Sequence, residues 1–178
     1  SGRRGIQIHL SQMRPDFQYL KKILAIGIPA SIEGTGRALS INALLIVVGT
    51  FSTSVVAGFG IGTRVFSVIF LPAIAVARGV ETMSGQNIGA GEYDRAQQAN
   101  YVAARGLFAI LGALGVLIFL VPTPIVSVFT DDPAVLSVGA EFLRFVALSF
   151  GFIGIMRAFT GGFRGAGKTL VAAAISIV

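Results

Sequence analysis

The 178-residue chain has no cysteine or tryptophan and few charged residues. Only 12% of its residues are charged, which is half of the roughly 25% that soluble domains carry. Without cysteine the chain has neither disulfides nor thiolate metal ligands. So few polar residues cannot cover a chain in which 54% of residues are hydrophobic and the mean hydropathy is +0.82. The composition predicts a membrane protein.

Long apolar segments alternate with short polar ones, which predicts an all-α, polytopic transmembrane helix bundle. Residues 1–22 are polar and basic, and we expect a cytoplasmic linker there. The first two expected helices are each roughly 43 Å long at about 1.5 Å per residue, longer than a hydrocarbon core of about 30 Å. They must tilt, bend or protrude, and Pro72 is the expected bend of the second. The expected spans are residues 23–51, 55–83, 102–129 and 135–160, and a fifth, truncated span at 169–178.

Most of the 14 lysines and arginines fall in the loops of one side. The loops at 52–54 and 130–133, on the other side, have none and carry Asp131 and Asp132. The positive-inside rule therefore predicts a cytoplasmic N-terminus and a cytoplasmic loop near residues 85–95. Scattered bases without an aromatic ladder do not indicate nucleic-acid binding. The basic residues on the predicted cytoplasmic side are Arg3, Arg4, Arg14, Lys21, Lys22, Arg95, Arg105, Arg164 and Lys168.

Two polar, glycine-rich stretches interrupt the apolar segments. In residues 83–96, MSGQNIGAGEYDRA, we expect Gly85, Gly89 and Gly91 to form a turn at a water interface. Residues 162–169, GFRGAGKT, fit the phosphate-loop pattern G-x-x-x-x-G-K-[ST]. A phosphate loop follows a strand, whereas this stretch follows a long apolar span, so we interpret the match as chance and predict no nucleotide binding.

Between the expected spans 102–129 and 135–160, Asp132 is the expected N-cap of a helix that Pro133 opens.

Glu33 lies about 15 Å into the first expected span. A carboxylate at that depth is costly unless it is paired, protonated or exposed to water. Arg37 and Ser40 continue the same helix face. Two interpretations stay open: a carboxylate that couples cation or proton movement in a central cavity, or an ion pair with Arg37 that only stabilises the helix. Arg64, which has no partner nearby in sequence, is a further candidate for that cavity, with Glu33 as a possible partner across helices.

Other charged residues inside the spans have simpler interpretations. We expect local ion pairs between Arg78 and Glu81 and between Glu141 and Arg144, and we expect Arg157 to reach the cytoplasmic interface. No histidine, cysteine or carboxylate cluster has catalytic or metal-ligand spacing. The sequence therefore predicts no enzyme activity, no metal and no cofactor.

Four stretches together resemble a known family. In order they are residues 27–33, 85–96, 129–133 and 162–169, and they resemble the second half of a multidrug and toxic compound extrusion transporter of the DNA-damage-inducible, prokaryotic type. The resemblance implies one partial lobe of a two-lobe, twelve-helix transporter in the plasma membrane. Its implied partners are the bilayer, the N-terminal lobe and small organic cations, exported in exchange for protons or sodium ions. The residues that carry the loop motifs are Gly85, Gln86, Gly89, Gly91, Arg164, Gly165 and Gly167.

The resemblance also bears on Glu33, which matches an acidic position in helix seven of some family members. Residues 150–155, FGFIGI, lack the second acid that those members carry in helix ten. One alternative is a related flippase for lipid-linked sugars, whose pyrophosphate needs a cationic cavity that Arg37, Arg64 and Arg157 would supply. Another is a membrane scaffold or assembly subunit without transport, with polar residues that face other helices and no central cavity.

Overall fold

A computed structural model of the chain describes residues 16–177, apart from the side chains of Ile26, Glu33 and Ile177. Every regular element in this part of the chain is a helix, which confirms the predicted all-α class. Three of these helices are long and apolar enough to cross a bilayer, and α5 with α6 would make a fourth, bent span. The helices are α1 (Phe17–Val48), α2 (Thr53–Gly89), α3 (Tyr93–Leu120), α4 (Pro122–Val126), α5 (Pro133–Ala147), α6 (Phe150–Gly165) and α7 (Thr169–Ile177).

The helices extend further into the polar segments than the expected spans did. Helix α1 begins at Phe17, because the Asp16 side chain caps it by accepting hydrogen bonds from the backbone N–H groups of Gln18 and Tyr19. The end of the expected linker 1–22 is therefore helical, while residues 1–15 lie outside the described residues. Helix α2 continues to Gly89 and α3 already begins at Tyr93. Hydropathy indicates only the apolar part of a helix, so it missed these polar ends.

The expected span over residues 135–160 is not one straight helix. Helices α5 and α6 meet at an angle of 54°, with Leu148 and Ser149 between them. The Ser149 hydroxyl donates a 2.7 Å hydrogen bond to the carbonyl of Val146, which occupies an acceptor at the end of α5. The expected cap at the other end of α5 is confirmed, because Asp132 Oδ1 accepts a 2.8 Å hydrogen bond from the N–H of Ala134.

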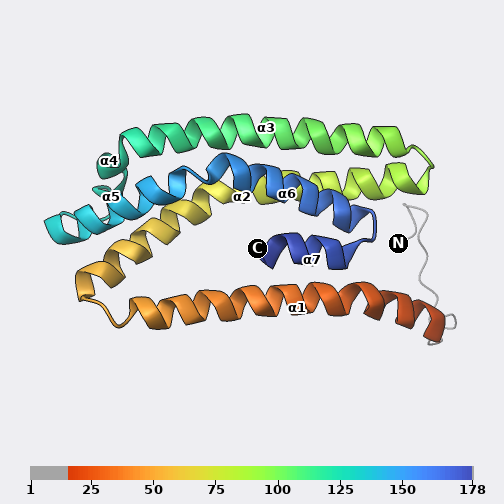
Figure 1. The fold of residues 1–178 in the computed structure, drawn as a ribbon, viewed down its shortest axis with the longest axis horizontal. Helices are drawn as coiled ribbons and strands as arrows, with labels where there is room; N and C mark the ends of the chain where they lie inside the picture. The colour runs from red at the N-terminus through yellow and green to blue at the C-terminus, as the bar shows by residue number, and fades with distance from the viewer. Residues whose placement is uncertain (1–15, 178) are drawn as a thin grey trace, which may run out of the picture.

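Prolines shape two further helices. The third expected span, 102–129, stops at Leu120, and Pro122 opens the short helix α4. Pro72 lies inside α2, and Figure 1 shows α2 changing direction in its yellow, middle part. A proline removes one backbone hydrogen bond and crowds the preceding turn, which explains a bend there.

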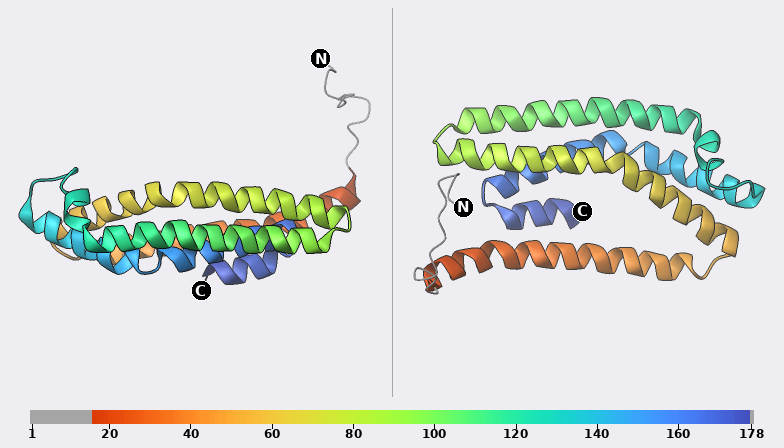
Figure 2. Two further views of the ribbon diagram at one scale, coloured as in Figure 1. Left: turned by 90° about the horizontal axis from the view of Figure 1, so that it is seen from above. Right: turned by 180° about the vertical axis from the view of Figure 1, so that it is seen from behind.

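Helix α6 packs against α2, α3 and α7, while α1 contacts mainly α7. Figures 1 and 2 show α1 along one side of a flat bundle, with α7 between α1 and α6. The core lies among α2, α3, α5 and α6, where Leu111, Leu143 and Phe150 are fully buried. In contrast, none of the apolar window of α1 is buried inside the bundle. Apolar surface of this kind suits contact with lipid or with further helices.

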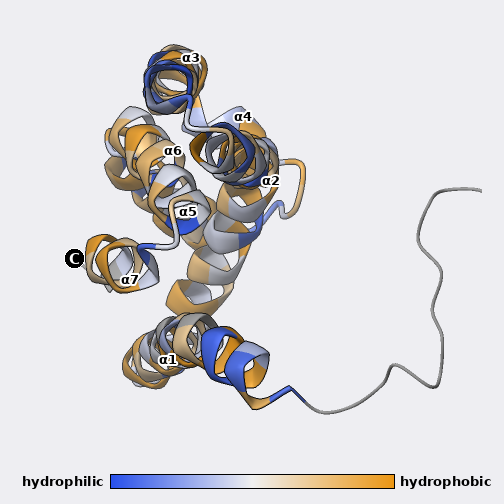
Figure 3. Cartoon of the chain, turned by 90° about the vertical axis from the view of Figure 1, so that its right-hand side faces the viewer, coloured by the Kyte–Doolittle hydropathy of each residue, from blue (hydrophilic) through white to orange (hydrophobic). Residues whose placement is uncertain are grey.

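The helix ends divide into two groups. The start of α1, the α2–α3 turn and the α6–α7 turn lie together at one end of the bundle, and the α1–α2 turn lies at the other with α4 (Figure 1). Seen from the first end, the segments nearest the viewer are largely hydrophilic (Figure 3). The turns that the sequence analysis assigns to opposite sides of the membrane therefore lie at opposite ends of the bundle.

Candidate functional site

The glycines of the 83–96 stretch do not all form the turn that we expected. Only Gly91 has a positive φ, +81°, and it lies in the turn between α2 and α3. Gly85, Gln86 and Gly89 are helical residues of α2. The expectation was wrong for Gly85 because this glycine serves helix packing: a Cβ on it would lie 3.3 Å from the carbonyl oxygen of Gly165 in α6.

The phosphate-loop-like stretch is likewise mostly helix. Gly162, Arg164 and Gly165 belong to α6, and Gly167, with a φ of +74°, forms the turn before α7. A phosphate loop needs successive backbone N–H groups that point at the anion. Here the backbone carbonyls of Gly162 and Phe163 accept hydrogen bonds from the N–H groups of Ala166 and Lys168 in a helix-ending turn. The glycine pattern thus reflects helix packing and termination.

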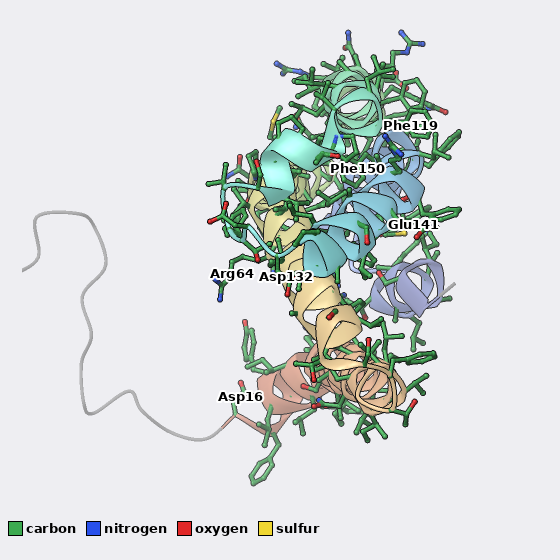
Figure 4. All side chains as sticks on the ribbon, turned by 90° about the vertical axis from the view of Figure 1, so that its left-hand side faces the viewer. Asp16, Arg64, Phe119, Asp132, Glu141 and Phe150 are labelled. Atoms are coloured by element: carbon green, nitrogen blue, oxygen red, sulfur yellow. The ribbon has the colours of Figure 1, made fainter. Side chains whose placement is uncertain are left out.

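The residues proposed for a central cavity do not form one described site. The side chain of Glu33 lies outside the described residues, so its role stays a prediction. The Ser40 hydroxyl is exposed and donates a 2.9 Å hydrogen bond to the carbonyl of Gly36 in its own helix. Arg64 is exposed on α2 and projects outward, away from α7 (Figure 4). Among the described side chains of this group, that of Arg37 lines a cavity.

Arg37 faces a cavity of about 300 Å³ between α1, α2, α6 and the start of α7. Arg78 and Glu81 of α2 and Arg164 of α6 also line it. A smaller cavity of about 80 Å³ shares these four residues and reaches Arg157. Four arginines from three helices line these two cavities, three of them in the larger and all four in the smaller. We call the two cavities together the arginine cavity.

Only one described carboxylate lines the arginine cavity. Arg78 Nη1 donates a 2.9 Å hydrogen bond to Glu81 Oε2, which confirms the expected local ion pair. The Arg78 side chain is 66% exposed and that of Glu81 is 31% exposed. The other expected pair is wrong, because no ion pair joins Glu141 and Arg144 among the contacts of the described side chains. The described lining of the arginine cavity thus combines one carboxylate with four arginines.

Close packing of α6 on α2 positions the arginines. A Cβ at Gly161 would overlap the carbonyl of Ala77, and one at Gly165 would overlap the carbonyl of Glu81. These two glycines let the helix backbones approach each other, as small residues do in membrane proteins. Arg164 is therefore held beside the Arg78–Glu81 pair. The sequence provides no direct link between Arg78 and Arg164. The only signal that they meet was that both lie near helix ends on the same predicted side of the membrane.

Comparison with known proteins adds a family assignment. The MatE family model matches residues 29–178. A probable multidrug resistance protein, YpnP of Bacillus subtilis, is 29% identical over 92% of the chain and 37% of its own length. A probable multidrug resistance protein, NorM of Thermotoga maritima, is 28% identical over 94% of the chain and 36% of its own length.

A third relative is not named for multidrug resistance. It is an FAD transporter of Shewanella oneidensis, 27% identical over 76% of the chain and 30% of its own length. The chain spans about a third of the length of each of these relatives. The match to the family model covers most of the chain and agrees with the long apolar helices. The chain is therefore a membrane-embedded, helical member of the multidrug and toxic compound extrusion (MatE) family.

Proposed function

We propose that the chain is part of a secondary active exporter that moves cationic drugs and other xenobiotics out of the cell in exchange for protons or sodium ions. The match of the MatE family over residues 29–178 carries this proposal, supported by relatives whose names describe multidrug resistance. In this proposal the protein lies in the plasma membrane with residues 1–22 in the cytoplasm, and an N-terminal lobe completes it. It acts as a transporter and not as an enzyme, without a cofactor.

Two features of the fold support a transport role. Helix α2 bends near Pro72, and α5 and α6 meet at 54°. Bent or interrupted helices are common in transporters, because one half of such a helix can move relative to the other. Alternating access requires two lobes that move against each other, so the described helices alone would form an inserted bundle without export activity.

We assign the coupling role in this proposal to Glu33. Ionised Glu33 would hold either the incoming proton or sodium ion or the outgoing organic cation, since both compete for one negative charge. Binding of the ion would then release the drug on the outer side. If Glu33 only pairs with Arg37, which follows one helical turn later, coupling lies in the other lobe.

The test measures ethidium efflux by the intact protein in cells that lack their own efflux pumps, with imposed proton or sodium gradients. Glu33→Gln should abolish efflux at equal membrane expression, because the neutral amide cannot bind and release a proton or sodium ion. Glu141→Gln is the matched control: Glu141 is an exposed carboxylate on α5 that does not line the arginine cavity. Normal efflux by Glu33→Gln would refute the coupling role, and no efflux of any solute by the wild type would favour the scaffold alternative.

A second candidate is an exporter of pyrophosphate-bearing solutes, such as lipid-linked sugars. The arginine cavity favours it, because Arg37 and Arg157, two residues that this alternative requires, lie around one space with two further arginines. The FAD transporter among the relatives fits the same class of solute. Uptake of a radiolabelled nucleoside diphosphate sugar into inverted vesicles tests this candidate against ethidium. Transport of ethidium alone would exclude it.

A further inference from the structure

A groove of about 550 Å³ lies between α2 and α3, apart from the arginine cavity. Residues in the ranges 76–87 and 95–103 line it, and we call it the α2–α3 groove. No other helix of the described part of the chain contributes to its lining. Figure 2 shows the two helices side by side along this length. The groove is therefore an open channel on the surface of the helix pair.

The α2–α3 groove changes from apolar to polar along its length. On α2 the lining residues follow one helix face from Val76 to Asn87, which lies beside the α2–α3 turn. On α3 they follow one face from Ala103 back to Gln98 and Arg95, which lie beside the same turn. Both helices thus place their polar groups at the hydrophilic end of the bundle (Figure 3). This order, a polar end and an apolar channel, matches an amphiphilic ligand.

The dimensions of the α2–α3 groove fit a hydrocarbon chain. From Val76 to Asn87 the groove is roughly 17 Å long, at about 1.5 Å per residue. One leaflet of a bilayer contributes about 15 Å, half of a hydrocarbon core of about 30 Å. Met83 and Val102 on its walls are exposed, and nothing lies within 4 Å of the Cβ position of Gly79. An acyl chain that starts at the polar end would therefore fill the groove over the thickness of its leaflet.

Arg95 supplies the charge that selects the headgroup. Its side chain is exposed, and it has no hydrogen-bond or ion-pair partner among the described residues. Glu92 and Asp94 are close in sequence but do not line the groove. The planar guanidinium group donates two parallel hydrogen bonds, which match the oxygens of a phosphate, and Gln98 adds an amide donor. The polar end of the groove therefore suits a phosphodiester with a net negative charge.

We propose that the α2–α3 groove binds one anionic phospholipid, with an acyl chain in the apolar channel and the phosphodiester on Arg95 and Gln98. The positive-inside rule predicts the α2–α3 turn on the cytoplasmic side, and the cytoplasmic leaflet carries anionic lipids. The lipid is a bound component and not a transported solute. The inference therefore goes beyond the exporter proposal and does not depend on it.

The experiment measures fluorescence quenching of a bimane label on the intact protein in bilayers, by phospholipids with brominated acyl chains. The label is attached through Gly106→Cys, because the chain has no cysteine and nothing lies within 4 Å of the Cβ position of Gly106. Position 106 lies one turn beyond Val102 on the same face of α3. Phosphatidylglycerol should bind about fivefold more tightly than phosphatidylcholine, since one arginine near an anionic lipid surface contributes about 1 kcal/mol.

Two arginine variants test whether the charge at the groove is responsible. Arg95→Gln should remove the preference for phosphatidylglycerol. Arg105→Gln removes the same charge from an exposed position of α3 that does not line the groove, so it should keep the preference. Quenching by phosphatidylcholine should persist in both variants, which shows that each is still inserted and folded.

A second pair of variants tests the channel. Gly79→Leu should fill the α2–α3 groove and bring the two lipids close to equal binding, because the acyl chain loses its place. Gly60→Leu is the control, since its Cβ position on α2 is equally open but does not line the groove.

Three results would overturn the proposal. The first is equal binding of the two lipids by the protein without these substitutions. The second is a preference for phosphatidylglycerol that survives Arg95→Gln, or that Arg105→Gln removes equally. The third is no quenching by either lipid, which would mean that another protein segment covers the groove. Because the assay involves no transport, its failure leaves the exporter proposal untouched, and a failure of export leaves lipid binding measurable.

Discussion

Asn100 of α3 donates a 3.0 Å hydrogen bond from Nδ2 to Oγ of Ser84 in α2, and Ser84 is completely buried. The same nitrogen donates a 2.9 Å hydrogen bond to the carbonyl of Ala96 in its own helix. Gly162 of α6 covers the Asn100 amide, and a Cβ there would overlap it. Three helices thus meet at one polar contact close to the α2–α3 turn.

Gly162→Ala should destabilise the protein by about 1–3 kcal/mol, because the added methyl group has no space beside Asn100. The measurement is the thermal unfolding midpoint of the intact protein in detergent. Gly112→Ala in α3 is the control, since nothing lies within 4 Å of its Cβ position. That variant should keep or raise the midpoint, because alanine favours a helix over glycine. Equal midpoints for the two variants would contradict the packing that we describe.

The Ser84–Asn100 hydrogen bond should contribute a coupling energy of about 0.6 kcal/mol, the average for such bonds between transmembrane helices, and no more than their maximum of about 1.7 kcal/mol. A double-mutant cycle with Ser84→Ala, Asn100→Ala and the double variant measures this energy. Asn100→Ala alone should cost more than Ser84→Ala, because it also removes the bond to Ala96. Strict additivity of the two substitutions would show that the contact contributes no stability.

Asp132→Ala should weaken the start of α5 by about 1 kcal/mol, because its carboxylate caps the N–H groups of Ala134 and Val135. Hydrogen exchange of these two amides should become several times faster. Asp131→Ala is the matched control, since the neighbouring carboxylate makes neither of these hydrogen bonds. The assignment of the cap fails if exchange responds equally to both substitutions.

Pro72→Ala should partly straighten α2, because alanine restores the missing backbone donor. The chain contains no cysteine, so spin labels can be attached to single introduced cysteines. The distance between labels at the exposed positions 57 and 83, which lie on opposite sides of Pro72, should increase. Labels at positions 75 and 83 lie on one side and should keep their distance. An unchanged distance between 57 and 83 would mean that tertiary packing imposes the bend.

The family relationship was readable because four short stretches follow one another in order along the chain, and the local signals were readable because each depends on residues that are close in sequence. The cap at Asp132, the ion pair of Arg78 with Glu81 and the long apolar helices are all of this kind. Their geometry follows from helical spacing alone. The helix ends were misjudged where polar turns continue a helix beyond its apolar part, as in α1 and α2.

The relationships across helices were decided by tertiary structure. Gly85, Gly161, Gly162 and Gly165 look like loop glycines in the sequence, yet they are helical and let α2, α3 and α6 approach closely. Nothing in sequence spacing brings Arg37 to Arg157, because their separation depends on how α7 packs between α1 and α6. The sequence by itself determined the helical membrane class and the residues that can carry charge. Only the packing decided which of those charges share a cavity, since repulsion and counter-charge act through space and not along the chain.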